Sequence, residues 1–246
     1  MRLRFRFSKV GKIRWTSHRD LARMWERAFR RVELPLAYTV GFSPRPKVSF
    51  GLALPTGYES VAEYLDVELD PSRVAGIDVF ALPPLLSAAL PAGVDVTAAA
   101  VIDDKSLSLQ HEVTSSEWDV EFAAGTDAAR LRELAGEALA ATALVVTRER
   151  KGHAVEEDVR PAILSLTVVE TTGVAPTLLA ELAAQPRALR PSEMLAAVAP
   201  DATVVRVRRL TQWISRADGA REEPLAAALP PDALADAPPA IELERV

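Results

Sequence analysis

The chain contains no cysteine and only three histidines in 246 residues, and these scarcities exclude several kinds of chemistry. Without sulfur there can be no disulfide, no thiol nucleophile and no thiolate-held iron–sulfur cluster. The histidines stand at positions 18, 111 and 153, a spacing that does not suggest a dedicated zinc site. We therefore expect no cofactor in this chain, and any metal or redox chemistry would belong to another polypeptide.

Long hydrophobic runs are also missing. No stretch approaches the 18 or more apolar residues that a transmembrane helix needs. The chain begins with MRLRFRF, which alternates apolar residues with arginine where a signal peptide would have a continuous apolar block. Because 49% of the residues are hydrophobic, there is enough apolar material for a core. We expect a soluble, cytoplasmic globular protein that does not bind a membrane.

Charge is distributed very unevenly along the chain. Residues 1–50 contain 13 Lys and Arg against three Asp and Glu, a net charge of +10, whereas residues 51–246 contain 16 against 31, a net charge of −15. Eight of the 14 aromatic residues lie in the same first fifth of the chain. A surface that is both basic and aromatic suits a polyanion such as RNA.

The first half has the pattern of a small α+β unit. Residues 2–9 alternate strictly, which predicts a strand with an apolar face and a face of three arginines. Ser17 is predicted to cap a helix with Asp20 in its first turn, and this helix ends before Pro35. Further strands are predicted around 47–50, 63–69 and 94–102, with a helix around 78–90. This β-α-β-β-α-β order is that of the ferredoxin-like fold.

The second half is predicted to repeat the same order. Its expected strands are 118–122, 143–148, 162–169 and 203–213, and its expected helices are 127–141 and a Pro-broken segment, 176–198. The predicted fold class is therefore α+β, with two tandem ferredoxin-like (βαββαβ) halves and antiparallel sheets; a single larger α+β domain is the alternative. The predicted domains are 1–103, which carries the basic face, a polar linker 104–116, and 117–214. An Ala-, Pro- and acid-rich composition predicts a disordered tail over 215–246.

The arginine face of the first strand is one candidate site. If this sheet face is open, Arg2, Arg4 and Arg6 would lie where ferredoxin-like modules bind single-stranded RNA. The alternative is that the second half covers the face, or that the arginines only solubilise an edge strand.

The start of the first helix is a second candidate. Arg14, Ser17, His18 and Asp20 gather where the helix dipole favours anions and a neutral imidazole, so they could clamp a phosphate or act in acid–base catalysis. The alternative is that Ser17 and Asp20 only cap the helix and that His18 is a surface residue.

Two further segments carry charge. In the Pro-rich loop 41–47, Phe42 offers a stacking plane while Arg45 and Lys47 offer charge, a combination suited to an unstacked nucleotide; a rigid connector is the alternative. In the second half, Asp158 and Arg160 precede a strand, and a structural salt bridge is the favoured interpretation.

A long set of residues in the first 66 positions forms a recognisable pattern. It comprises Ser8, Lys9, Gly11, Arg14, Trp15, Ser17, His18, Asp20, Leu21, Arg23, Arg27, Ala28, Arg30, Arg31, Leu34, Pro35, Tyr38, Gly41, Phe42, Ser43, Pro44, Pro46, Lys47, Ser49, Phe50, Gly57, Ser60 and Glu63-Tyr64-Leu65-Asp66. Asp158-Val159-Arg160-Pro161 supplies a second signature. Together they resemble the bacterial radical-SAM-associated (radical-SAM-linked) family, DUF2344, over roughly residues 2–210. Arg19 and Arg45 depart from the pattern, which often has an apolar residue and a histidine there, so an acid–base role for that histidine does not carry over.

The resemblance implies a role beside a radical SAM enzyme. Members are encoded next to, or fused to, radical SAM proteins, sometimes with a cobalamin-binding domain, and often near a ribonuclease of the E/G type and ribosomal-protein genes. This implies an accessory RNA-binding subunit that presents substrate, rRNA or tRNA, for RNA modification. The radical SAM partner would hold the iron–sulfur cluster, S-adenosylmethionine and in some systems cobalamin.

Residues from both lines of reasoning form the predicted RNA- or phosphate-binding set. It contains Arg2, Arg4, Arg6, Lys9, Arg14, Ser17, His18, Arg23, Tyr38, Phe42, Arg45, Lys47 and Arg160. Two alternatives remain open. The chain could itself modify RNA, in the manner of pseudouridine synthases and with His18 or Asp20 catalytic, or it could be a protein-interaction adaptor.

Overall fold

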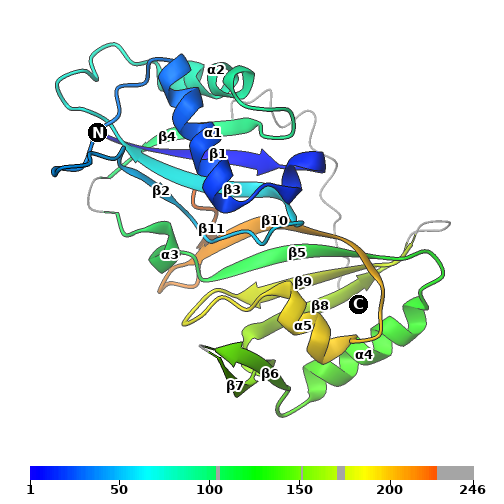
Figure 1. Cartoon of the computed structure of the whole chain (residues 1–246). Helices are drawn as coiled ribbons and strands as arrows, with labels where there is room; N and C mark the ends of the chain where they lie inside the picture. Colours follow the sequence, from blue (N-terminus) through cyan, green and yellow to red (C-terminus); the bar gives the residue numbers. More distant parts are fainter. Residues whose placement is uncertain (104–105, 151, 171–174, 226–246) are drawn as a thin grey trace.

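The computed structural model of the chain (Figure 1) describes residues 1–103, 106–150, 152–170 and 175–225. The first half contains β1 (Arg2–Lys9), a short 3-10 helix (Gly11–Trp15), α1 (His18–Arg31), β2 (Val48–Phe50), β3 (Glu59–Glu68), a second 3-10 helix (Val79–Ala81), α2 (Leu82–Ala89) and β4 (Val96–Ile102). The second half contains α3 (Leu109–Glu112), β5 (Ser115–Phe122), α4 (Ala128–Ala140), β6 (Val145–Arg150), β7 (His153–Asp158), a 3-10 helix (Arg160–Ala162), β8 (Ile163–Val169), β9 (Thr177–Ala183), α5 (Pro191–Val198), β10 (Val204–Ser215) and β11 (Arg221–Glu222).

One sheet runs through both halves. Its strand order is β4-β1-β3-β10-β5-β9-β8, with β2 paired to β3 and β11 paired to β10. Its neighbouring strands are antiparallel, except that β10 runs parallel to β3 through two residue pairs, Arg208↔Glu59 and Arg209↔Ser60. A separate hairpin is formed by β6 and β7. The predicted α+β class with a mostly antiparallel sheet is confirmed.

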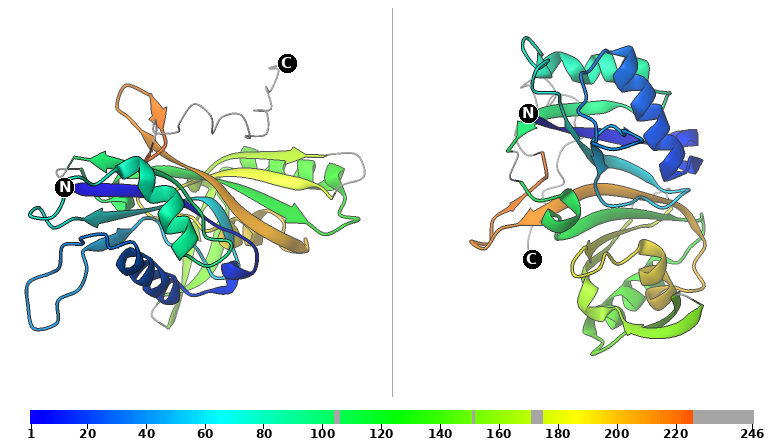
Figure 2. Two further views of the ribbon diagram at one scale, coloured as in Figure 1. Left: turned by 90° about the horizontal axis from the view of Figure 1, so that it is seen from above. Right: turned by 60° about the vertical axis from the view of Figure 1, so that its left-hand side comes forward.

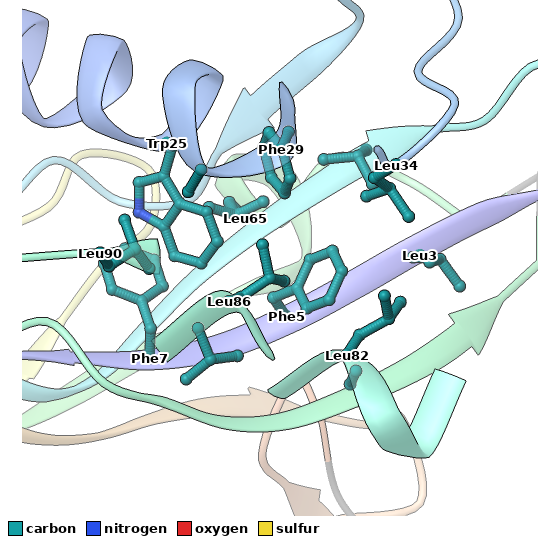
Figure 3. Close-up of a cluster of buried hydrophobic side chains, with 14 of the residues drawn as sticks. Leu3, Phe5, Phe7, Trp25, Phe29, Leu34, Leu65, Leu82, Leu86 and Leu90 are labelled. Atoms are coloured by element: carbon teal, nitrogen blue, oxygen red, sulfur yellow. The ribbon is translucent and has the colours of Figure 1, made fainter. Parts of the chain in front are cut away.

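The first hydrophobic core lies between α1, α2 and the β4-β1-β3 part of the sheet (Figure 3). The alternation of β1 puts Leu3, Phe5 and Phe7 on this face, where all three are buried. Trp25 of α1 lies over them, with its ring centroid 5.0 Å from that of Phe7. An apolar stripe on α1 therefore seals one side of β1, and the opposite side of the helix carries its arginines.

A second core lies under α4 and α5 in the other half of the molecule (Figures 1 and 2). Trp118, Val120 and Phe122 of β5 are buried there, together with Leu131 of α4 and Met194 of α5. The two cores belong to different parts of the sheet, which is continuous across the β3–β10 pairing.

The segment 176–198 differs from the helix predicted for it. Its first part is the strand β9, which lies between β5 and β8, and only Pro191–Val198 is helical. Leu178, Ala180 and Leu182 are buried while their neighbours are half-buried, so the segment alternates as a strand should. The helical prediction was wrong because the ladder partners of β9 outweigh the high helix propensity of Ala, Leu and Glu. The strand β7 was not predicted at all.

The predicted linker contains a short helix, and the beginning of the tail, for which disorder was predicted, is structured. In the predicted linker 104–116, Leu109 of α3 and Val113 are buried, although residues 104 and 105 lie outside the described residues. In the predicted tail 215–246, residues 221–222 form β11, and Leu225 packs with Ala62 and Tyr64 on the sheet face opposite α1. The remaining tail residues, 226–246, lie outside the described residues.

Candidate functional site

The arginines of β1 point away from the first core, as predicted, but they do not form a free basic face. Arg4 is buried, and its Nε donates to Asp66 Oδ1 at 2.7 Å, while an Arg2 guanidinium nitrogen lies 2.6 Å from Asp66 Oδ2. Arg6 lies 3.3 Å from Glu223. Burial alone would lower the pKa of Arg4, but the carboxylates of Asp66 and Glu112 raise it above its usual value.

This face is closed because two later segments cover it. Leu109 of α3 and Leu225 pack there against Tyr64, and the carbonyl of Pro224 accepts a hydrogen bond of 3.0 Å from Arg4. The prediction of an open sheet face was therefore wrong, and Arg4 in particular has almost no surface with which to meet a ligand.

Lys9 and Arg14 hold the turn between β1 and α1. Lys9 is buried, and its Nζ donates to the carbonyls of Thr16 at 2.9 Å and Arg14 at 3.3 Å. Burial lowers the pKa of Lys9, and the charge of Glu63 only partly offsets this effect. Arg14 is partly exposed, pairs with Glu59 at 3.3 Å and lies over the ring of Trp15.

The start of α1 shows capping geometry. Ser17 is the N-cap, as predicted: its Oγ accepts from the Asp20 backbone N–H at 3.2 Å and donates to Asp20 Oδ2 at 2.8 Å. Asp20 also pairs with Arg23 at 3.3 Å. The exposed ring of His18 meets Phe50 edge-on, with 4.9 Å between centroids. The carboxylate of Asp20 thus serves the cap and Arg23.

Arg160 fixes the end of α4 and the start of β8. Its guanidinium donates to the carbonyl of Leu139 at 2.7 Å and to that of Ile163 at 2.8 Å. Asp158 accepts backbone hydrogen bonds from Leu144 and Arg160, so the expected salt bridge between the two side chains is replaced by contacts with the main chain. Backbone hydrogen bonds from Leu144 and Arg160 lower the pKa of Asp158. Three nitrogens of the Arg160 guanidinium thus donate to backbone carbonyls, and the residue lies in the second half of the chain, apart from the other predicted residues.

Three of the remaining predicted residues, Arg23, Tyr38 and Arg45, line a groove between α1 and the loop 36–46. The groove has a volume of about 550 Å³. Its lining includes four arginines, one carboxylate and one exposed aromatic ring: Arg19, Arg23, Arg30, Arg45, Glu26 and Tyr38. We call this the basic groove. Within the described part of the chain, Arg19, Arg30 and Arg45 form no ion pair, so their charge is available to a ligand.

The loop that forms the outer wall of the basic groove is held by its own backbone. The Thr39 N–H donates to the Arg45 carbonyl at 2.9 Å, and the Arg45 N–H donates to Thr39 Oγ1 at 3.0 Å. At its tip, Phe42 is fully exposed. Lys47, at the base of the loop, pairs with Glu68 at 2.6 Å. The left view of Figure 2 shows this blue loop projecting beside α1, which leaves its tip free to touch a partner.

Sequence reasoning located this groove only in part. Of the predicted residues, Arg23, Tyr38 and Arg45 line the basic groove, and Phe42 lies at the exposed tip of its loop. Arg19 and Arg30 also line the groove but were not in the predicted set. Their signal was present, because both lie off the apolar stripe of α1, but a solvated helix face gives the same pattern.

The described residues contain neither a candidate metal site nor a membrane-spanning helix. Among the described residues, no group of three or more His, Asp or Glu side chains is arranged to hold a metal ion. In the same part of the chain, no helix has the length and apolar character needed to cross a membrane.

The fold and the groove thus define an α+β protein with a mostly antiparallel sheet and a cationic, aromatic groove beside its first helix. The chain belongs to the family described as uncharacterized protein conserved in bacteria (DUF2344), whose family model matches residues 2–191. A comparison with curated proteins finds no match.

Proposed function

We propose that this protein is an accessory RNA-binding subunit that presents RNA to a radical SAM enzyme. The observation that carries the proposal is the basic groove, where Arg19, Arg30 and Arg45 have no described carboxylate partner. Unpaired arginines beside exposed aromatic rings are the combination that proteins use to hold an RNA backbone and its unstacked bases.

The distribution of charge along the chain also supports RNA binding by the first half. Residues 1–103 contain 14 Lys and Arg against 11 Asp and Glu, a net charge of +3, and residues 104–246 contain 15 against 23, a net charge of −8. The second half therefore repels RNA while the first half attracts it. Since Tyr38 and Phe42 are exposed, the favoured ligand is a single-stranded or looped region of rRNA or tRNA.

The radical SAM partner is inferred from the family resemblance. The present chain has no cysteine, so it cannot supply the three thiolates that hold a radical SAM cluster. In this proposal the partner carries the iron–sulfur cluster, S-adenosylmethionine and in some systems cobalamin, and this chain supplies the RNA-binding surface for RNA modification.

We further infer that each half is a ferredoxin-like unit, with 1–103 and 117–214 as the two domains. The strand orders β4-β1-β3-β2 and β10-β5-β9-β8 support this inference, because both place the first strand between the fourth and the third. The hairpin of β6 and β7 is then an insertion in the second unit.

A salt titration tests RNA binding by the basic groove. The affinity of the full chain for a labelled single-stranded RNA is measured from low to high salt, and log affinity should fall linearly with log salt concentration. For single strands, each lost phosphate contact lowers the magnitude of this slope by roughly 0.7. The triple variant Arg19→Gln, Arg30→Gln, Arg45→Gln should therefore lower it by about two. An affinity that does not change with salt would reject the proposal.

A matched control removes the same charge elsewhere. Arg130, Arg132 and Arg216 are exposed and lie in the second half, so their replacement by Gln changes the net charge equally. The control variant should keep the salt dependence of the wild type. Equal losses in the two triple variants would show that net charge, and not the groove, attracts the RNA. Capture of an acidic protein in place of RNA from nuclease-treated lysate would favour the adaptor alternative.

A further inference from the structure

A second cavity lies where the two halves meet, and it has a volume of about 700 Å³. One wall is the segment Leu52–Pro55, which follows β2, and the other is the connection from β9 into α5, residues 183–193. Ser116, Trp118, Arg148, Leu182 and Arg209 complete the lining. We call it the seam cavity. It shares no lining residue with the basic groove.

Two buried lining side chains of the seam cavity have hydrogen-bond donors without acceptors. Arg209 and Trp118 are 2% and 3% exposed, and neither Arg209 Nε nor Trp118 Nε1 has an acceptor among the described residues. Buried polar atoms are almost always satisfied in folded proteins, so two such donors in the wall of one cavity point to an acceptor supplied by a ligand.

The orientation of Arg209 is fixed by its other contacts. Its Nη1 donates to Glu63 Oε1 at 2.8 Å and to the Leu52 carbonyl at 3.0 Å, and its guanidinium carbon lies 4.6 Å from the centroid of the Trp118 ring. Glu63 neutralises the charge of Arg209. The Nε–H and the indole N–H are therefore unpaired donors in a rigid setting, without a free charge of their own.

The net charge of the cavity comes from three other arginines. Arg148 and Arg187 both pair with Glu157, at 2.5 and 3.0 Å, and Arg187 also pairs with Glu193 at 2.9 Å. Arg190 is exposed and forms no ion pair with a described carboxylate. Three guanidinium groups against two carboxylates leave one positive charge, held by Arg190, to attract an anion.

Most of the other lining residues are apolar and suit an organic body, with Ser116 and Ser192 as polar exceptions. Leu52, Leu54, Leu182 and Leu189 contribute side chains to the walls. Small-molecule sites commonly have volumes of about 300–1,000 Å³, with mostly apolar walls and a few placed polar groups. Arginine binds phosphate oxygens through paired N–H groups.

We propose that the seam cavity binds an organic phosphate about the size of one nucleotide. Its phosphate lies against Arg190, and an acceptor on its body meets the N–H groups of Trp118 and Arg209. The ligand is either a free nucleotide or the 5′-phosphorylated end of an RNA strand. The proposal does not depend on RNA binding in the basic groove.

The test uses the full chain and the four nucleoside 5′-monophosphates, with binding measured by calorimetry. At least one should bind, and Ala53→Trp, which fills the cavity from an exposed lining position, should abolish the binding. Arg190→Gln should weaken it at least fivefold, because it removes the unpaired charge. Trp118→Phe, which keeps the ring but removes the N–H, should weaken it to a similar degree. Unfolding curves confirm that each variant is folded.

Two controls separate this proposal from RNA binding in the basic groove. Arg30→Gln, in the basic groove, should leave nucleotide binding unchanged even where it weakens RNA binding. A 5′-phosphorylated oligonucleotide that displaces the mononucleotide, when its 5′-hydroxyl counterpart does not, would identify an RNA end as the source; displacement by neither would identify a free nucleotide. Failure of all four monophosphates to bind at millimolar concentration, or binding that survives both Ala53→Trp and Arg190→Gln, would overturn the proposal.

Discussion

Arg4 and Asp66 are direct partners across β1 and β3, and both side chains are almost completely buried with 2.7 Å between Arg4 Nε and Asp66 Oδ1. Arg2 contacts the second oxygen of the same carboxylate at 2.6 Å. Two arginines that would be expected to face a ligand thus neutralise a carboxylate inside the protein. Arg2 and Arg4 therefore stabilise the fold, and arginines without an ion pair among the described residues lie instead on α1 and the loop 36–46.

Replacing Asp66 by Ala should lower the free energy of unfolding by about 3–5 kcal/mol, because it removes the closest counter-charge of a buried guanidinium and leaves only Glu112, at 3.3 Å. Urea unfolding at neutral pH measures the effect. Glu68→Ala is the matched control on the same strand: Glu68 pairs with Lys47, but both side chains are about half exposed, so a change of about 0–1 kcal/mol is expected. Similar losses in the two variants would show that burial of the Arg4–Asp66 pair is unimportant.

Glu59 should make stability depend on pH at the junction of the two halves. Its carboxylate accepts from Arg208 at 2.8 Å and from the Gly11 N–H at 2.9 Å. Burial alone would raise the pKa of Glu59, but Arg208, Gly11 and Arg14 hold it below the ordinary value of 4.5. The charged form is therefore favoured in the folded state. Its contribution is complete above the ordinary pKa and is lost as the pH falls through the lowered folded-state pKa.

Urea unfolding of the wild type and Glu59→Gln between pH 7 and pH 3 measures this contribution. The variant should be less stable at pH 7, and its stability should decline less steeply in acid. Glu156→Gln, an exposed position on β7, should follow the wild-type curve. Parallel curves for Glu59→Gln and the wild type would contradict the assignment.

Local features of this fold could be predicted from the sequence. The alternation of β1 and the Ser17 cap of α1 each depend on residues within a few positions of one another, and both are present as predicted. The Pro-rich loop 41–47 was also predicted as a loop, and Phe42 is exposed in it. In each case the physical signal lies inside one short segment.

Features that depend on distant partners could not be predicted. The closest counter-charge of Arg4 is 62 residues away in the sequence, and the two segments that cover the arginine face contain Leu109 and Leu225. The strand β9 has a helix-favouring composition, and its position between β5 and β8 determines its conformation. The seam cavity gives no sequence signal, because its two walls, Leu52–Pro55 and residues 183–193, are far apart in the sequence and meet only in the folded protein.

Leu225 should contribute to stability although it lies in a segment whose composition predicts disorder. Its side chain is 9% exposed and packs with Tyr64 and Leu109, and the neighbouring Glu223 accepts a hydrogen bond of 2.8 Å from the Tyr64 hydroxyl. Leu225→Ala should lower the free energy of unfolding by about 2 kcal/mol, near the lower end for buried leucines because the site is at the edge of the core. Leu107 is exposed and lies just before α3, so Leu107→Ala should have little effect on the free energy of unfolding. A Leu225→Ala variant as stable as the wild type would show that this segment does not cover the sheet.

Phe42 should determine the preference for unpaired bases in the proposed RNA interaction. Its ring is fully exposed at the tip of the loop, so Phe42→Ala should leave the unfolding temperature unchanged. Loss of one stacking contact should weaken binding of single-stranded RNA by about 1–3 kcal/mol. Double-stranded RNA should be bound equally by variant and wild type, because its bases are stacked internally and are not available to the ring. The salt dependence should also be unchanged, since no charge is removed.

Val40→Ala is the control, because Val40 is equally exposed in the same loop but has no ring. An equal loss of affinity in both variants would assign the effect to the shape of the loop, and stacking on Phe42 would be rejected.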